Sequence, residues 1–178
     1  MQNPVRSSDA EASALSRELR ESDDASLRRR RGVVALSLVA AGAMGVIALY
    51  QMGITKHIPE PPLPKLDADT VDASAEAYQM LETPDAVLGF GSYGVTMALA
   101  AMGGAARAER QPLLPLALAG KVAIDVVQAG RLTIDQFTKH RAFCSWCLLA
   151  AGATFAMAPL VVPEARAALR NMASHTVS

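Results

Sequence analysis

The sequence predicts an all-α fold, a transmembrane four-helix bundle with a short amphipathic helix in its outer loop. Three windows of the 178-residue chain carry no charged side chain: Gly32–Thr55, Ala86–Ala106 and Ala142–Pro163. Each window reaches the roughly 20 residues that a bilayer-spanning helix needs. Three such windows in one small chain favour a membrane protein. A fourth helix, over Pro112–Gly130, completes the predicted bundle.

The two ends of the chain are polar. Residues 1–31 are predicted to form a mostly disordered cytoplasmic tail, with room for a frayed helix over Asp9–Glu21. Residues 164–178 are predicted to form a cytoplasmic tail that begins as a helix on the membrane surface. The basic tract Arg28–Arg31 abuts the first apolar window, which is typical of a topology signal. Anionic-lipid or nucleic-acid binding is its alternative, but the net charge of zero favours no nucleic-acid partner.

The first helix is predicted over Gly32–Tyr50, with small residues on one face for close packing. The outer loop, Gln51–Pro84, opens with a proline-rich and therefore extended stretch. Apolar residues then recur at helical spacing and predict an amphipathic helix over Asp69–Leu81. The loop is therefore either an ordered lid or a disordered segment.

The second helix is predicted over Pro84–Gly104, and the glycines around Ser92 allow close approach by another helix or by a flat ligand. The third helix contains Lys121 and Asp125, which share one face because they are four residues apart. They form either a self-neutralising ion pair or a polar contact for a bound ligand. A second outer loop, 131–141, leads to the last helix, over Ala142–Pro163.

The distribution of basic residues predicts the orientation. With four spans, 11 of the 17 basic residues lie on the side of the two termini and 5 lie on the other side. The positive-inside rule then makes both termini cytoplasmic. The second outer loop consequently faces a compartment in which disulfides persist.

The chain has two cysteines, Cys144 and Cys147, and they form a Cys-x-x-Cys pair at the start of the last helix. A helix N-terminus favours the reactive thiolate, and so do the basic residues Lys139, His140 and Arg141 just upstream. The pair is interpreted first as redox-active and second as two structural thiols. A zinc site usually takes four ligands and would need His140 and His57 as well, at loose spacing, so no metal site is predicted.

Two segments resemble a known family. The segment 81–91, LETPDAVLGFG, resembles the turn into the second helix of the bacterial vitamin K epoxide reductases, and Ala142–Leu148 resembles the entry to their last helix. The four helices, the long first outer loop and the position of the Cys-x-x-Cys pair agree with this resemblance. It covers roughly Gly32–Pro163 and implies a single four-helix domain over residues 32–163.

The resemblance implies a membrane thiol–disulfide oxidoreductase of a bacterial inner membrane, in contact with membrane lipid. Its cofactor would be a quinone, menaquinone or ubiquinone, held without a covalent bond. Its partner would be a periplasmic thioredoxin-like protein. Cys147 would contact the quinone and Cys144 would exchange disulfides, while Phe143 and Trp146 flank the ring. Ser92 and Asp125 are further candidates for quinone contact, and local inference assigns proton or thiolate support to the basic residues 139–141.

One departure from the family pattern is the loop after the first helix, which normally carries a second cysteine pair that relays electrons. Between Gln51 and Pro84 this chain has no cysteine. Either a partner protein reaches Cys144 directly, or the chain has another task. The alternative function is a non-catalytic membrane subunit that scaffolds a larger assembly.

Overall fold

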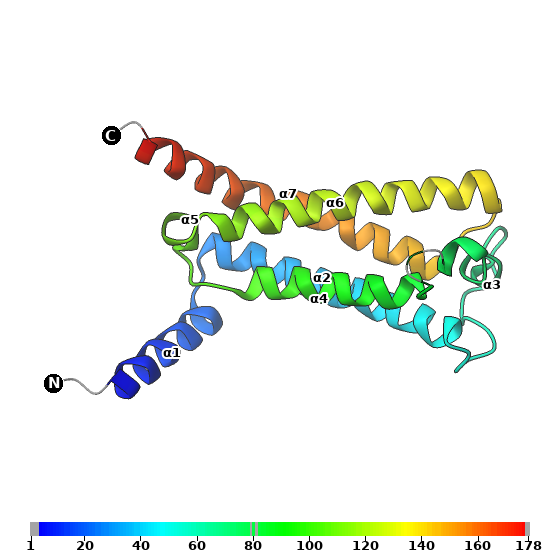
Figure 1. Ribbon diagram of the computed structural model, residues 1–178, viewed down its shortest axis with the longest axis horizontal. Coiled ribbons are helices and arrows are strands. Elements are labelled where there is room, and N and C mark those ends of the chain that lie inside the picture. Colours follow the sequence, from blue (N-terminus) through cyan, green and yellow to red (C-terminus); the bar gives the residue numbers. More distant parts are fainter. Residues whose placement is uncertain (1–3, 79, 81, 177–178) are drawn as a thin grey trace.

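The computed structural model describes residues 4–78, 80 and 82–176, and these residues fold almost entirely into helices (Figure 1). The elements are α1 (Pro4–Glu21), α2 (Ala25–Gln51), α3 (Ala68–Asp72), the 3-10 helix η1 (Ala75–Tyr78), α4 (Asp85–Ala101), α5 (Arg107–Arg110), α6 (Leu113–Asp135), the π-helical turn η2 (Gln136–His140) and α7 (Ser145–Thr176). The all-α fold class is therefore confirmed.

Four of these helices form the bundle. α2 packs against α4 and α7, and α6 packs against α7. The helical stretches 25–51, 113–140 and 145–174 are long and apolar enough to cross a membrane, and each contains an 18-residue window whose mean hydropathy is 2.3, 1.5 and 1.8 respectively. α4 is apolar but has 17 residues, which span about 26 Å at 1.5 Å per residue. The chain is thus an all-α membrane bundle.

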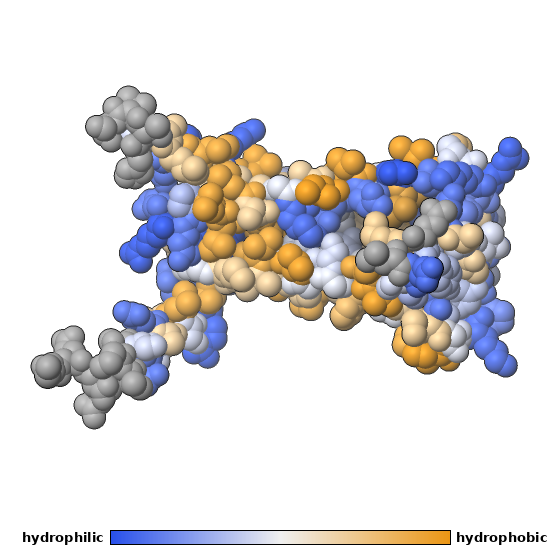
Figure 2. Space-filling view, in the orientation of Figure 1, coloured by the Kyte–Doolittle hydropathy of each residue, from blue (hydrophilic) through white to orange (hydrophobic). Residues whose placement is uncertain are grey.

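The two ends of the bundle differ. Figure 1 shows both termini and α5 at one end, and α3 at the opposite end beside the junction of α6 and α7. On the face drawn in Figure 2, hydrophobic side chains gather mainly between two hydrophilic ends. We call the end that carries α3 the outer end and the other the terminal end.

α4 is shorter than the predicted Pro84–Gly104 helix because its last turn is capped by an arginine. Met102 is extended and Gly103 has a φ of +76°. Arg30, only 4% exposed, donates to the carbonyl oxygens of Ala100, Met102, Gly103 and Gly104 over 2.7–3.1 Å. The carbonyls that end a helix lack partners within it, and the guanidinium supplies them.

A second buried arginine joins α4 to α7. Arg107 donates to the carbonyls of Leu99 and Met102 at 2.7 and 2.8 Å. It also forms a two-bond ion pair with Glu164, at 2.8 and 2.7 Å. The predicted end of the last helix at Pro163 is therefore wrong: α7 runs on to Thr176, because Glu164, Ala165 and Ala168 are buried against the bundle.

The N-terminal segment contains the helix predicted over Asp9–Glu21, but that helix, α1, is longer and includes residues 4–21, so less of the segment is irregular than predicted. Arg31 donates to the carbonyls of Leu19 and Ser22 at the end of α1. Glu18 accepts the backbone N–H of Ala105 at 3.1 Å, which ties α1 to the turn after α4. Residues 25–31 are already part of α2, which Asp24 caps by accepting the N–H groups of Ser26 and Leu27.

The predicted amphipathic helix over Asp69–Leu81 is also revised, although Leu81 itself lies outside the described residues. The segment forms two short helices, α3 and η1. The helix breaks after Asp72. The carbonyl oxygen of Asp72 accepts a hydrogen bond from the side-chain amide of Gln51 at 3.2 Å instead of from a backbone N–H of a further helical turn. The hydroxyl of Tyr78 donates to the carbonyl of Gln51 at 3.3 Å and holds η1 against the same residue.

Candidate active site

The cysteine pair lies at the start of α7, at the outer end. Cys144 directly precedes the helix, and its sulfur accepts the N–H of Cys147 at 3.2 Å. Its carbonyl accepts the N–H of Leu148 at 3.0 Å, so Cys144 acts as the cap of the helix. Both thiols are free; Cys144 is completely buried and Cys147 is partly buried. The two sulfurs thus have different access to reactants.

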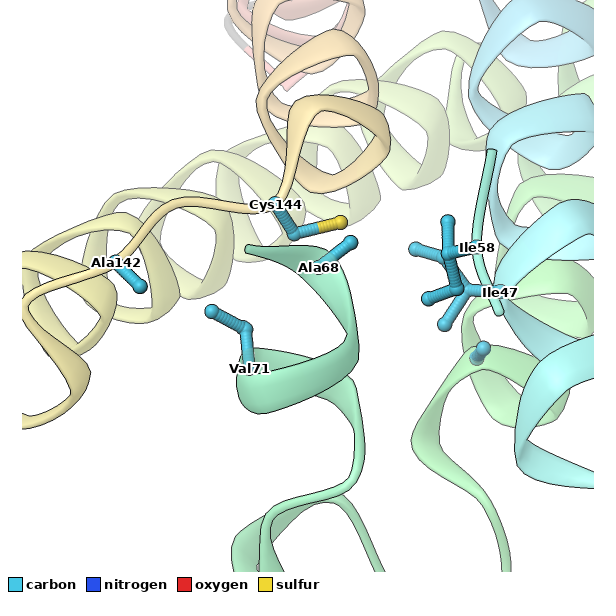
Figure 3. Packing of buried hydrophobic residues seen from close by; sticks show 7 residues of the cluster. Ile47, Ile58, Ala68, Val71, Ala142 and Cys144 are labelled. Atoms are coloured by element: carbon cyan, nitrogen blue, oxygen red, sulfur yellow. The ribbon is translucent and has the colours of Figure 1, made fainter. Parts of the chain in front are cut away.

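An irregular segment, residues 57–67, with a turn at Lys65, covers Cys144, and we call it the strap. Leu66 and Phe143 form an isolated parallel bridge, in which Phe143 donates to the carbonyl of Lys65 at 2.8 Å and Asp67 donates to that of Phe143 at 3.0 Å. Figure 3 shows Cys144 beside Ala68 and Val71 of α3 and opposite Ile58 of the strap. The strap and α3 are therefore an ordered cover over Cys144.

Polar contacts fasten the strap to the first turn of α7. The Glu60 carboxylate accepts the backbone N–H and hydroxyl of Ser145, at 3.4 and 3.1 Å, and its other oxygen accepts the N–H of Ala68 at 3.1 Å. The indole N–H of Trp146 donates to the carbonyl of Pro59 at 2.7 Å. Trp146 also packs partly buried against the core cluster that contains Cys144. Glu60 thus joins the strap, α3 and α7.

Asp72 is the residue of this site that sequence reasoning missed. It is the last residue of α3, it is 4% exposed, and its Oδ1 accepts the Cys147 thiol at 3.5 Å. Its Oδ2 is buried and has no hydrogen-bond partner among the described residues. Burial raises the pKa of Asp72 to about 6, against the opposing effect of the two neighbouring thiols. A carboxylate that titrates near neutrality beside a thiol is suited to accept its proton.

Sequence offered a weak signal for Asp72. Three aspartates, at 67, 69 and 72, occupy the segment that carries α3. Asp67 caps the helix by accepting the N–H and hydroxyl of Thr70, and these bonds lower the pKa of Asp67. Asp69 accepts a hydrogen bond from the Ile58 backbone and pairs with His57. Asp72 neither caps the helix nor binds residues 57 and 58. Its position beside the cysteines depends on the tertiary fold and cannot be predicted from the local sequence.

The predicted supporting residues lie on the outer surface. Lys139 bonds to Glu76 at 3.1 Å and to Asp135 at 3.2 Å, and His140 faces Glu76 at 3.7 Å. Arg141 lines an open cavity of about 470 Å³ together with Lys65, Phe137, Thr138 and Phe143. Phe143 stacks on Phe137 there, with ring centroids 6.3 Å apart. Lys139 and His140 are thus engaged with carboxylates, while Arg141 and Phe143 form part of a basic and aromatic cavity.

Ser92 and Asp125 lie close together because the side chain of Lys121 bonds to both of them. Lys121 Nζ donates to Ser92 at 2.8 Å and to the two oxygens of Asp125 at 2.7 and 2.6 Å, and it bonds to Thr96 at 3.2 Å. The predicted Lys121–Asp125 ion pair is therefore confirmed. The neighbouring Tyr93 hydroxyl bonds to Thr154 of α7 at 2.8 Å. Tyr93 thus links α4 to α7 beside this polar group.

An apolar helix bundle with a pair of free thiols at the outer start of its last helix is typical of integral membrane proteins that carry out thiol–disulfide chemistry. Comparison with family models agrees with this class. The model of the vitamin K epoxide reductase family matches residues 32–162, and the chain belongs to this family. Its members are membrane proteins of the thiol–disulfide oxidoreductase type. Comparisons with curated proteins and with solved structures found no match.

Proposed function

We propose that this chain is a membrane thiol–disulfide oxidoreductase that couples the Cys144–Cys147 pair to a quinone, menaquinone or ubiquinone. A thioredoxin-like protein at the outer end is the proposed electron donor. The observation that carries the proposal is a hydrogen bond at the start of α7: the thiol of Cys147 donates to the buried carboxylate of Asp72 in α3. Membership of the vitamin K epoxide reductase family supports the same conclusion.

The residues around Cys147 would present a largely apolar surface to a quinone ring. Cys147 packs with Met44, Ile47, Ala86 and Trp146 in one hydrophobic cluster. Sites for small molecules are mostly apolar, with a few polar groups that fix orientation. Asp72 supplies such a group, and Trp146 offers an aromatic face. A bound quinone would accept two electrons and two protons from the pair.

Of the two protons that the pair would give up to the quinone, the chain's own groups account for the movement of one, that of Cys147. Oxidation of the pair forms the Cys144–Cys147 S–S bond and releases two electrons and two protons. Asp72 accepts the proton of Cys147, and the N–H of Cys147 stabilises negative charge on the Cys144 sulfur at 3.2 Å. A dithiol of the partner then reduces the disulfide by thiol exchange and becomes oxidised itself.

Because the outer loop has no cysteine pair to pass electrons from the partner to Cys144, the partner itself must reach the Cys144 sulfur. Because Cys144 is completely buried beneath the strap, we propose that the partner displaces the strap before exchange. The cavity lined by Lys65, Arg141 and Phe143 adjoins the bridge that holds the strap, and we assign the docking of the partner to it. Arg141 would then provide the thiolate support, since Glu76 already engages Lys139 and His140.

The other candidates take roles that follow from their contacts. Phe143 lines the outer cavity, so we assign ring contact to Trp146 in preference to Phe143. Ser92 and Asp125 are held by Lys121 and would form a polar wall of the ring site.

The direct test is single-turnover reduction of a water-soluble quinone by the pre-reduced, purified protein. We expect one quinone reduced per chain, followed by absorbance, and none for Cys144→Ser or Cys147→Ser. The variants must melt like the wild type, so that lost activity reflects lost chemistry. Equal quinone reduction by wild type and both variants would overturn the proposal and leave the scaffolding subunit as the better account.

A further inference from the structure

The cysteine pair and Asp72 form a cluster with the composition of a metal site. One ligand atom from each residue, the two sulfurs and a carboxylate oxygen, lies within 4.8 Å of the other two. Zinc binds thiolate sulfur at about 2.3 Å and carboxylate oxygen at about 2.0–2.2 Å. In the tetrahedral geometry that zinc prefers, two ligands of one ion are therefore about 3.6–3.8 Å apart, so shifts of up to about 1 Å would close the site.

A second, independent observation is the unsatisfied oxygen of Asp72. Asp72 as a residue is only 4% exposed, yet its Oδ2 has no partner among the described residues. A buried acceptor without a partner costs free energy, and a cation beside it would remove that cost. The Cys147 thiol donates to Oδ1 of the same carboxylate, so the group already faces the pair.

We propose that the reduced protein binds one thiophilic divalent cation, of the zinc type, through Cys144, Cys147 and Asp72. Binding releases the two thiol protons and moves no electrons. The fourth position is left to water, because Cys147 is only partly buried. Soft thiolates favour zinc over magnesium or calcium. His57 and His140 take no part; they face Asp69 and Glu76.

The consequence for activity rests on the proposed function. Both sulfurs are engaged in the metal-bound form and cannot form the disulfide, whereas the disulfide form offers no thiolate to the metal. The ion therefore holds the pair reduced and blocks its oxidation. Metal binding itself requires only the free thiols and the carboxylate.

Cobalt(II) titration of the full-length protein, reduced with a phosphine and free of quinone, tests the site. We expect sulfur-to-cobalt absorption bands that saturate at one ion per chain and disappear when zinc is added. We also expect at least about tenfold weaker binding for Asp72→Asn, with Asp72→Glu closer to the wild type. Asp69→Asn is the matched control, because Asp69 lies on the same short helix but faces His57; its binding should be unchanged.

Three results would overturn the inference: no cobalt bands, bands that persist at full strength in Asp72→Asn, or equal binding by the disulfide form. The outcome is separable from that of the quinone test. A reduced protein that reduces quinone but binds no cobalt refutes the metal site alone. One that binds cobalt but reduces no quinone refutes the proposed function alone.

Discussion

At the scale of single residues, the site depends on a carboxyl group that the fold has made unusually basic. Burial is the main cause of the raised pKa of Asp72, about 6. A raised pKa means that folded Asp72 holds its proton more tightly than it does in the unfolded chain. The free energy of unfolding therefore falls as pH rises from about 4, the ordinary value, through 6.

Replacing Asp72 by asparagine should remove this pH dependence. Because asparagine carries no charge to bury, we expect metal-free Asp72→Asn to be more stable than the wild type at pH 8, by roughly 1–3 kcal/mol. The difference should shrink at pH 4.5. Unfolding in detergent micelles with a chelator present measures it, with Asp69→Asn as control. A variant that is less stable than the wild type at pH 8 would contradict this account of the burial.

The same substitution should slow the chemistry. Without a group to accept the Cys147 proton, we expect quinone-dependent oxidation of the pair at pH 7 to fall about 10²–10⁴-fold in Asp72→Asn. Stopped-flow absorbance of the quinone follows the rate. The wild-type rate should rise with pH around 6, and the variant should lack that step. A variant with the wild-type rate and pH profile would remove Asp72 from the mechanism.

At the scale of elements, α4 depends on arginines from other parts of the chain. Arg30 supplies donors to four backbone carbonyls at the end of this short helix. We expect Arg30→Gln to lower the free energy of unfolding by about 2–4 kcal/mol, because buried carbonyls lose charged donors. Thermal unfolding in micelles measures the loss. Arg28→Gln, at an exposed position of the same tract, is the control, and an equal effect of both would refute the capping role.

Elements differ in how far the sequence predicts them. Hydropathy predicts the four helices of the bundle, because the cost of unpaired backbone in lipid acts on each span alone. The longer reach of α7 depends on the Arg107–Glu164 pair, whose partners are 57 residues apart. The position of Asp72 depends likewise on Gln51 and the strap. The position of the cysteine pair at the start of the last helix is local and could be predicted, whereas contacts between distant loops could not.

At the scale of the whole molecule, both termini lie at one end of the bundle and the cysteine pair lies at the other (Figure 1). The excess of basic residues predicts that the terminal end is cytoplasmic. In a chain with both native cysteines replaced by serine, we expect Lys56→Cys to react with an impermeant maleimide in intact cells. Arg170→Cys should react only after lysis, and both positions are exposed. The reverse pattern would invert the proposed orientation.

Counting thiols before and after contact with a quinone tests the central claim most directly. The purified protein is reduced, freed of reductant, exposed to a soluble quinone and treated with a mass-adding maleimide under denaturing conditions. We predict that both thiols disappear within minutes and only when quinone is present, because Cys144 and Cys147 then form a disulfide. Two thiols that remain free and modifiable in the presence of quinone would contradict the enzyme account and leave a protein that shares the family's fold alone.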